Sequence, residues 1–212
     1  MKVIPIGAPN TGKGTRIREI LEQNGDQWES VCASTELKAE VKAGTAIGKE
    51  IKSYMDRGEL VPDELIIRLV LEKVVQSKKN LFLDGFPRTV AQAKAMLNEG
   101  IRPDLIINLQ VDEEIILERA RNRIVCGKCG TSFSKEGDKA PKVEGICDCC
   151  GEQLKQRADD ADEEIVRRRL EVYKAETEPL LSFFEETGIK ICTMNNFGPE
   201  AAVKFKQLLL EN

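Results

Sequence analysis

The sequence predicts an α/β protein with a parallel sheet that carries helices on both faces. Segments typical of buried strands alternate with segments whose apolar residues have helical spacing. A glycine-containing loop, Gly7–Thr15, joins the first strand to the first helix. Two segments interrupt the alternation, because residues 32–60 read as helical throughout and residues 125–160 are rich in cysteine. We therefore expect one core with two insertions, the core comprising residues 1–31, 61–124 and 161–212.

The composition is that of a globular protein of 212 residues, with 41% hydrophobic and 32% charged residues. A formal charge of −4 gives no reason to expect a nucleic acid as partner. No apolar run reaches the length of a membrane span, and residues 1–20 lack the pattern of a signal peptide, so a cytoplasmic protein is expected. Because histidine is absent, a histidine base and imidazole metal ligands are excluded.

The loop Gly7–Thr15 has the composition of a phosphate-binding loop. It follows the apolar run Val3–Ile6 and ends in Gly-Lys-Gly-Thr as a helix begins. Glycines let backbone amides curl around an anion, and the helix N-terminus adds the positive end of its dipole. We expect Lys13 to reach the β- and γ-phosphates and the Thr15 hydroxyl to lie near magnesium. The glycine after Lys13 departs from the general motif, and a turn without a ligand is the alternative.

The remaining elements follow from apolar periodicity and boundary residues. Strands are predicted at 3–6, 80–84, 104–111 and 188–192, and residues 30–33 form a short apolar run. Helices are predicted at 16–21, 36–41, 47–55, 62–74, 91–97, 115–123, 163–174, 178–186 and 201–210. Ser34 or Thr35 is the expected N-cap of the second helix, and Arg57-Gly58 is the expected end of the third. Pro5 removes a hydrogen bond from the first strand.

Four of the seven cysteines form two C-x2-C pairs, Cys126 with Cys129 and Cys147 with Cys150. Two such pairs direct four thiolates at one centre, which is the closed tetrahedral site of structural zinc. A closed site offers no open position for chemistry, so we expect the metal to stabilise the insertion. The sequence does not distinguish zinc from iron, and unrelated surface cysteines are the alternative. Cys149 is left over as an expected free thiol.

Arginines flank the cysteine-rich insertion on both sides. They are Arg119 and Arg123 before it and Arg157, Arg167, Arg168 and Arg169 after it, with Asp159 and Asp160 behind Arg157. Salt bridges on a solvated surface are the ordinary explanation for such residues. Beside a phosphate loop, converging guanidinium groups instead suit phosphoryl transfer, which depends on positioning and charge neutralisation.

Together these motifs resemble the adenylate kinase family of nucleoside monophosphate kinases. The matching segments are Gly7–Thr15, Leu60–Glu64, Leu83–Thr89 with Gln92, Arg119 with Arg123, the two cysteine pairs, and Arg157–Asp160 through Arg169. The resemblance implies a P-loop nucleoside triphosphate hydrolase-like fold in which residues 32–60 bind the monophosphate and residues 125–160 form a zinc-ribbon-like lid. It also implies transfer of the γ-phosphoryl group of ATP to AMP, giving two ADP, with Mg2+ on ATP and structural Zn2+. We expect a monomer that binds small nucleotides and neither nucleic acid nor membrane.

The resemblance assigns roles residue by residue. The residues implied for ATP are Gly12, Lys13, Gly14, Thr15, Arg119 against the adenine, and Arg123. The residues implied for AMP are Ala33, Lys38, Val61, Gly85, Arg88, Gln92, Arg157 and Arg169. Asp84 is implied to hold magnesium through water. Arg123, Arg157 and Arg169 would close on the transferring group, with Asp159 and Asp160 ordering them.

The acceptor helix departs from the family pattern. Ala33, Thr35 and Lys38 stand where threonine, aspartate and arginine are usual, and a lysine offers a point charge where arginine offers a bidentate fork. Asn10 also replaces a loop glycine, and Arg16 a common glutamine. Three interpretations follow: an adenylate kinase with weakened acceptor binding, a kinase for another monophosphate, or a slow ATP-binding paralogue acting as a sensor or partner protein. The match at Gln92 and in the stretch before Pro62 favours the first.

Overall fold

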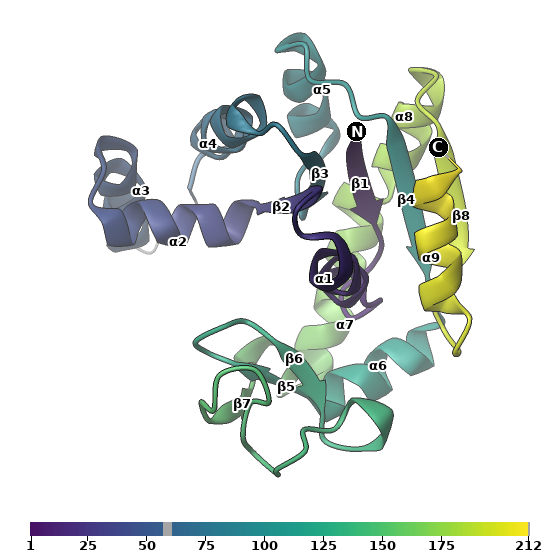
Figure 1. The fold of residues 1–212 in the computed structure, drawn as a ribbon. Helices are drawn as coiled ribbons and strands as arrows, with labels where there is room; N and C mark the ends of the chain where they lie inside the picture. The colour runs from purple at the N-terminus through teal and green to yellow at the C-terminus, as the bar shows by residue number, and fades with distance from the viewer. Residues whose placement is uncertain (57–60, 212) are drawn as a thin grey trace.

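A computed structural model describes residues 1–56 and 61–211 of the chain. It confirms the predicted α/β architecture, with a five-stranded parallel sheet in the order β2-β3-β1-β4-β8 and a separate three-stranded antiparallel sheet in the order β6-β5-β7 (Figure 1). The expected helix end at Arg57-Gly58 and the matched Leu60 lie outside the described residues. Within the described part of the chain, no helix is both long and apolar enough to cross a membrane.

The large sheet is built from strands β1 (Lys2–Ile6), β2 (Trp28–Cys32), β3 (Asn80–Asp84), β4 (Leu105–Gln110) and β8 (Ile191–Asn195). The helices are α1 (Lys13–Asn24), α2 (Ala33–Ala43), α3 (Ala46–Asp56), α4 (Asp63–Gln76), α5 (Val90–Asn98), α6 (Glu113–Asn122), α7 (Glu163–Val172), α8 (Pro179–Glu186) and α9 (Ala201–Leu210). Helices α2 and α3 extend away from the sheet beside α4, as Figure 1 shows.

Alternate residues of the central strands supply two separate cores, one on each face of the sheet. Ile4 and Ile6 of β1 lie in a cluster that α4, α5 and α8 cover. Val3 of the same strand lies in the opposite cluster, which α1 and α9 cover. This alternation is what a strand buried on both faces requires, so the apolar runs read as parallel strands are confirmed.

Pro5 ends the pairing between β1 and β3. The carbonyl of Met1 accepts from Leu81 of β3 and that of Lys2 accepts from Asp104 before β4, so odd residues of β1 face β3. The β1–β3 register stops at Val3 opposite Phe82, whereas β1–β4 pairing continues to Ile6. The Pro5 nitrogen faces the side on which pairing stops, and it has no hydrogen to donate.

Two predicted boundaries are wrong. Neither Ser34 nor Thr35 caps the second helix, because α2 begins at Ala33 directly after β2, with Cys32 at the cap position and no side chain bonded there. The last strand is not 188–192 but Ile191–Asn195. Gly188 (φ 69°) and Ile189 instead end α8, since their amides donate to Glu185 and Phe184 in the pattern of a Schellman motif.

The predicted helices 163–174 and 178–186 are joined in the structure. After α7 ends at Val172, a π-helical turn, Tyr173–Thr177, leads directly towards α8. Tyr173 packs against the core cluster under α4, α5 and α8. The extra residue of the π turn thus lets α7 and α8 form one continuous, bent helix that packs onto the sheet.

The antiparallel sheet lies in the cysteine-rich insertion, where no strands were predicted. Its strands are β5 (Arg123–Cys126), β6 (Ser132–Ser134) and β7 (Leu154–Gln156). Helix α6 leads into it and α7 leads out, and the two helices pack through Leu117, Ala120 and Val166. The insertion is therefore connected to the rest of the chain through α6 and α7, which pack against each other in a small core.

We predict that Phe82→Ala lowers the free energy of unfolding by about 3–5 kcal/mol, because it leaves a cavity in the aromatic centre of one core. The Phe82 side chain is 0% exposed, and its ring centroid lies 4.6 Å from that of Trp28 and 6.2 Å from that of Phe205. Urea unfolding followed by circular dichroism measures the loss. The matched control is Phe197→Ala, since Phe197 is 58% exposed. Equal midpoints for the two variants would contradict the assignment of this core.

Candidate active site

The phosphate loop lies at the carboxyl end of the parallel sheet, between β1 and α1. Its turn is closed by Thr11, whose buried hydroxyl donates to the Ala8 carbonyl at 2.8 Å. Gly12 is the cap residue of α1 and has φ 96°, which a residue with a Cβ adopts only with strain. No side chain caps α1, so the first amides of the helix face the open end of the loop, where an anion is favoured.

Lys13 lies at the centre of a group of charged side chains. Its ammonium group donates to the carbonyls of Gly7 and, at 2.9 Å, of Ala8. Burial lowers the pKa of Lys13 to about 8, while the nearby Asp84 carboxylate opposes that shift. The positive charges of Arg88, Arg169 and Arg123 add to the lowering of this pKa, in that order, so all three lie close enough to act on Lys13.

Asp84 ends β3 directly across from the loop. Burial raises the pKa of its carboxyl group, while Lys13 and then Arg88 oppose the rise. Among the described residues, no group donates a hydrogen bond to this carboxylate, so its oxygens are free to bind a hard cation such as Mg2+. The next residue, Gly85, has φ 69°, and a Cβ there would come within 3.1 Å of the Arg88 guanidinium.

Arg88 follows the cis Phe86-Pro87 bond and folds back on the strand end. Its Nε donates to the Gly85 carbonyl at 2.9 Å, and the residue is exposed. Gln92, which the resemblance implies for AMP binding, is buried, and its side chain is already hydrogen-bonded. It accepts from the Arg88 amide at 2.8 Å and donates to Asp63 of α4 at 2.8 Å. In this structure Gln92 therefore ties Arg88 to the start of α4.

Two of the arginines that flank the insertion, Arg123 and Arg169, meet at a buried carboxylate. Asp160, with a side chain 0% exposed, accepts from Nε of Arg123 at 2.7 Å and from its terminal nitrogen at 2.9 Å. Arg169 lies 3.4 Å from the same carboxylate. Arg157 pairs with Asp159 at 2.6 Å, on the exposed side of the group. The structure thus brings together all five of these predicted residues.

Asn10 connects the phosphate loop to that cluster. Its amide nitrogen lies 3.4 Å from the Asp160 carboxylate. Its φ of 62° is the left-handed conformation that asparagine tolerates better than most residues with a side chain. Its Oδ1 is buried, and no partner for it lies within the part of the chain that the structure describes. The residue that replaces a loop glycine thus reaches from the loop to the insertion.

Arg119 is fixed by three backbone carbonyls. Its guanidinium nitrogens donate to the carbonyls of Asn10 at 3.4 Å, Thr11 at 3.0 Å and Asn196 at 2.8 Å. Because the hydrogens of a guanidinium group lie in its plane, these bonds leave a flat face for stacking. Burial lowers the pKa of this group, and the neighbouring Arg16 adds to the lowering.

Asn196 was missed by the sequence analysis. It follows β8, is 1% exposed, and bonds to Arg16, to Thr11 and to the end of β4. A polar residue at the carboxyl end of a parallel strand is a site signal, because ligands bind at that edge of the sheet. The signal was hidden because the predicted strand ended three residues too early.

Helix α2, which the sequence predicts to bind the acceptor, lies apart from the arginine cluster. Ala33 is buried at its start, whereas Thr35 and Lys38 are exposed. Lys38 makes no ion pair with any described residue. The helix is anchored on α4 instead through Lys73, which lies 3.7 Å from Glu36 and 3.4 Å from Glu40. Val61 lies between α3 and α4, partly buried, at the edge of the described residues.

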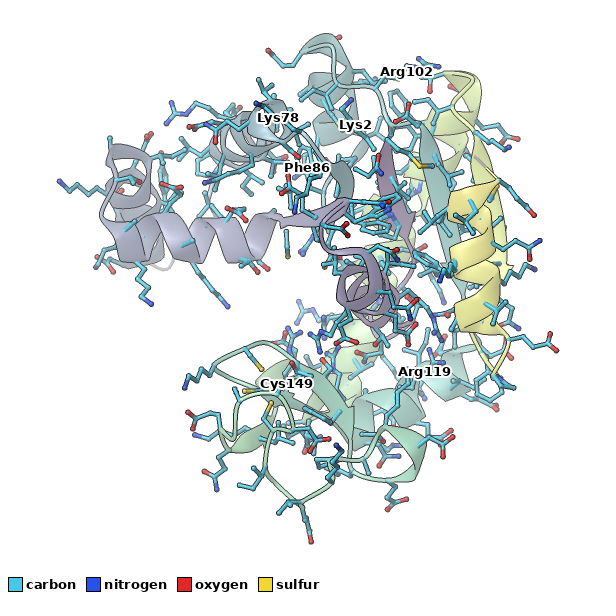
Figure 2. All side chains as sticks on the ribbon, viewed as in Figure 1. Lys2, Lys78, Phe86, Arg102, Arg119 and Cys149 are labelled. Atoms are coloured by element: carbon cyan, nitrogen blue, oxygen red, sulfur yellow. The ribbon has the colours of Figure 1, made fainter. Side chains whose placement is uncertain are left out.

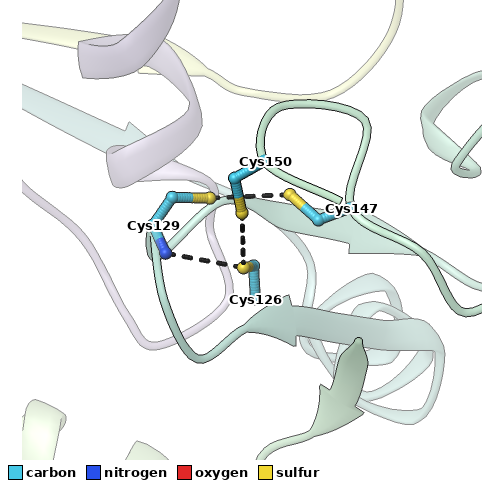
Figure 3. A group of neighbouring side chains, drawn as sticks. All are labelled: Cys126, Cys129, Cys147 and Cys150. Atoms are coloured by element: carbon cyan, nitrogen blue, oxygen red, sulfur yellow. Dashed lines mark hydrogen bonds between the residues drawn. The ribbon is translucent and has the colours of Figure 1, made fainter. Parts of the chain in front are cut away.

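The four paired cysteines gather as predicted (Figure 3). The sulfur atoms of Cys126, Cys129, Cys147 and Cys150 all lie within 4.8 Å of one another. Cys126 and Cys147 are buried, and each lies against a sulfur of the opposite pair. Four thiolates at these separations can hold one metal ion. Cys149 is exposed and outside the group, as expected (Figure 2).

The insertion touches α1 through its first cysteine pair. Arg18 donates to the carbonyl of Gly130, the residue after Cys129, at 2.9 Å. Lys139 lies 3.9 Å from Glu19 of the same helix. These contacts hold the insertion beside α1, the helix that follows the phosphate loop.

Comparison with known proteins gives one consistent family. The family model for adenylate kinase matches residues 5–189. The chain is 45% identical over 195 residues to an adenylate kinase of Thermodesulfovibrio yellowstonii, covering 89% of each chain. It is 43% identical over 197 residues to an adenylate kinase of Caldicellulosiruptor saccharolyticus, covering 90% of each. A similar protein of Bacillus subtilis, also an adenylate kinase, is 43% identical over 194 residues, with 89% of this chain and 88% of that one covered.

Proposed function

The chain belongs to the adenylate kinase family and is an ATP:AMP phosphotransferase, and we propose that the charges around Lys13 carry the reaction. The observation that supports this most directly is that Asp84, Arg88, Arg169 and Arg123 all act electrostatically on Lys13. Lys13 lies where the phosphate loop meets α1, and the other four come from the end of β3, the stretch before α5, α7, and the junction of α6 with β5. Phosphoryl transfer requires such converging charge.

On the donor side, we propose that the first amides of α1 and the Lys13 ammonium bind the β- and γ-phosphates of ATP. The face of Arg119 would pack against the adenine, because its hydrogens are already bonded to carbonyls. Mg2+ would neutralise phosphate charge in the bound complex. Asp84, through water, and the Thr15 hydroxyl are the oxygen donors that would hold it.

On the acceptor side, Arg88 would bind the phosphate of AMP, positioned by the bond from its amide to Gln92. Arg123, Arg157 and Arg169 would stabilise the charge of the group in transfer. No residue needs to act as a general base, since AMP attacks through a phosphate oxygen that is already ionised. The three interpretations of helix α2 differ in how this acceptor side binds its substrate. We favour an adenylate kinase with weakened AMP binding, because Ala33 and Lys38 offer fewer hydrogen bonds to AMP than threonine and arginine would.

We propose that residues 125–160 act as a lid whose fold is stabilised by a zinc ion. The insertion has a core of three buried residues, Cys126, Cys147 and Leu154, which is too small to fold it alone. A lid excludes water, which would otherwise compete with AMP as acceptor. We further propose a monomer with its core, acceptor insertion and lid divided as the sequence predicts, working in the cytoplasm.

A coupled assay of ADP formation with AMP, CMP, UMP and GMP as acceptors tests the function. We expect turnover with AMP in the presence of ATP and Mg2+. A large preference for a pyrimidine nucleotide would support a kinase for another monophosphate. Absence of turnover with all four would leave only the slow ATP-binding paralogue.

We predict that Lys38→Arg lowers the KM for AMP by about three- to tenfold, because a bidentate guanidinium replaces a point charge. The KM for ATP should stay unchanged, since α2 lies away from the phosphate loop. Lys42→Arg is the matched control, because Lys42 is an exposed lysine near the end of the same helix. An unchanged KM for AMP in Lys38→Arg would remove Lys38 from the acceptor site.

We predict that kcat/KM for ATP falls by about tenfold per pH unit above the Lys13 pKa of about 8. The sign follows from burial, which favours the neutral amine and so lets Lys13 lose its charge at a lower pH than usual. In Lys13→Arg the remaining activity should lack this decline, because a guanidinium stays charged. A wild-type profile that is flat to about pH 10 would contradict the prediction.

We predict that Cys126→Ser loses the bound metal and lowers the midpoint of thermal unfolding, because three thiolates cannot close a tetrahedral site. Elemental analysis of the purified protein identifies the metal and should give about one zinc ion per chain in the wild type. The control is Cys149→Ser, which should keep both metal and stability. Unchanged metal content in Cys126→Ser would refute the site, and iron would refute zinc.

A further inference from the structure

Asn196 makes all its hydrogen bonds on the donor side of the site. Its Oδ1 accepts from Nε of Arg16 at 2.7 Å, and its Nδ2 donates to the Thr11 carbonyl at 2.6 Å. Its backbone amide donates to Gln110 at 2.8 Å, and its carbonyl accepts from Arg119 at 2.8 Å. One residue thus touches α1, the phosphate loop, β4 and α6.

The orientation of the Asn196 amide is fixed by its partners. A guanidinium nitrogen can only donate and a carbonyl oxygen can only accept, so Oδ1 must face Arg16 and Nδ2 must face Thr11. The side chain is also pressed against the loop, since a Cβ on Gly12 would come within 2.8 Å of Nδ2. The shape of the loop at Thr11 and Gly12 therefore depends on this amide.

We propose that Asn196 is a positioning residue for the nucleoside triphosphate. Through its amide it holds the loop that receives the phosphates, and through its carbonyl it holds Arg119, which is proposed to lie against the base. Arg119 shares the Thr11 carbonyl with Asn196, so the two residues form one brace between the base and phosphate ends of the donor site. The inference rests on the proposed function, because it takes ATP as the donor.

The brace should act on one substrate only. None of the hydrogen bonds of Asn196 reaches Arg88, Gln92 or α2, which belong to the acceptor side. Losing the amide should therefore weaken the binding of ATP and leave that of AMP as it is. A residue that merely stabilised the fold would change both constants together, or neither.

The test compares Asn196→Ala and Asn196→Asp with the matched control Asn195→Ala, whose side chain is exposed. We expect Asn196→Ala to raise the KM for ATP by about tenfold and to change the KM for AMP by less than about twofold. Asn196→Asp keeps an oxygen for Arg16 but turns a second oxygen towards the Thr11 carbonyl. Because the bond to Arg16 is kept, this variant should retain thermal stability better than Asn196→Ala. Because the bond to Thr11 is lost, it should still show the raised KM for ATP. Asn195→Ala should behave as the wild type.

Titration calorimetry with a non-hydrolysable ATP analogue, without AMP, gives the same comparison as an equilibrium affinity. Equal rises in both KM values, or an Asn196→Asp variant with wild-type affinity for the analogue, would overturn the inference. Should Asn196→Ala fail to fold, Asn196→Asp alone decides between these outcomes. Absence of phosphoryl transfer by the wild type would instead refute the proposed function, so the two failures are distinguishable.

Discussion

The proposed active site depends on keeping several cations close together in the absence of phosphate. Lys13, Arg88, Arg123 and Arg169 repel one another, and burial of Lys13 and Arg123 adds the cost of removing water from those two groups. The fully buried carboxylate of Asp160 offsets this for Arg123 by a bidentate pair, and it also lies next to Arg169. Without that anion, the two arginines would turn towards solvent, where an ammonium or guanidinium group is better hydrated.

The Asp84 carboxylate stabilises the positive charge of Lys13 without forming a hydrogen bond to it. It makes no hydrogen bond within the described residues, and burial raises the pKa of its carboxyl group. Asp160 is thus committed to its arginines, whereas Asp84 keeps oxygens free for a cation. Two carboxylates in one cluster are given distinct roles by their surroundings, one holding protein groups and one available to a ligand.

The sequence predicts those parts of the site whose residues lie close together along the chain. The phosphate loop, Asp84 at a strand end and the paired cysteines each lie within a few residues, so spacing alone identifies them. Asn196 and Thr11 are 185 positions apart, and Asn10 and Asp160 are 150 apart, so their contacts exist only once the fold is formed. The last strand was misplaced for a local reason, because Gly188-Ile189 suits both a strand start and the end of a helix.

Helix α2, which we propose to bind the acceptor, is built into the fold less firmly than the loop that we propose to bind the donor. Helix α2 is attached mainly through α3, through α4 and through its strand β2, so its exposed face carries little of the core. Thr35 and Lys38 lie on that exposed part, where substitutions cost little folding stability. On the proposed donor side, by contrast, Arg16 and Asn196 are buried against each other, and a change in one removes a buried hydrogen bond from the other. A substitution there disturbs a buried network, whereas one at the exposed positions of α2 can alter the proposed acceptor site with little cost in folding stability.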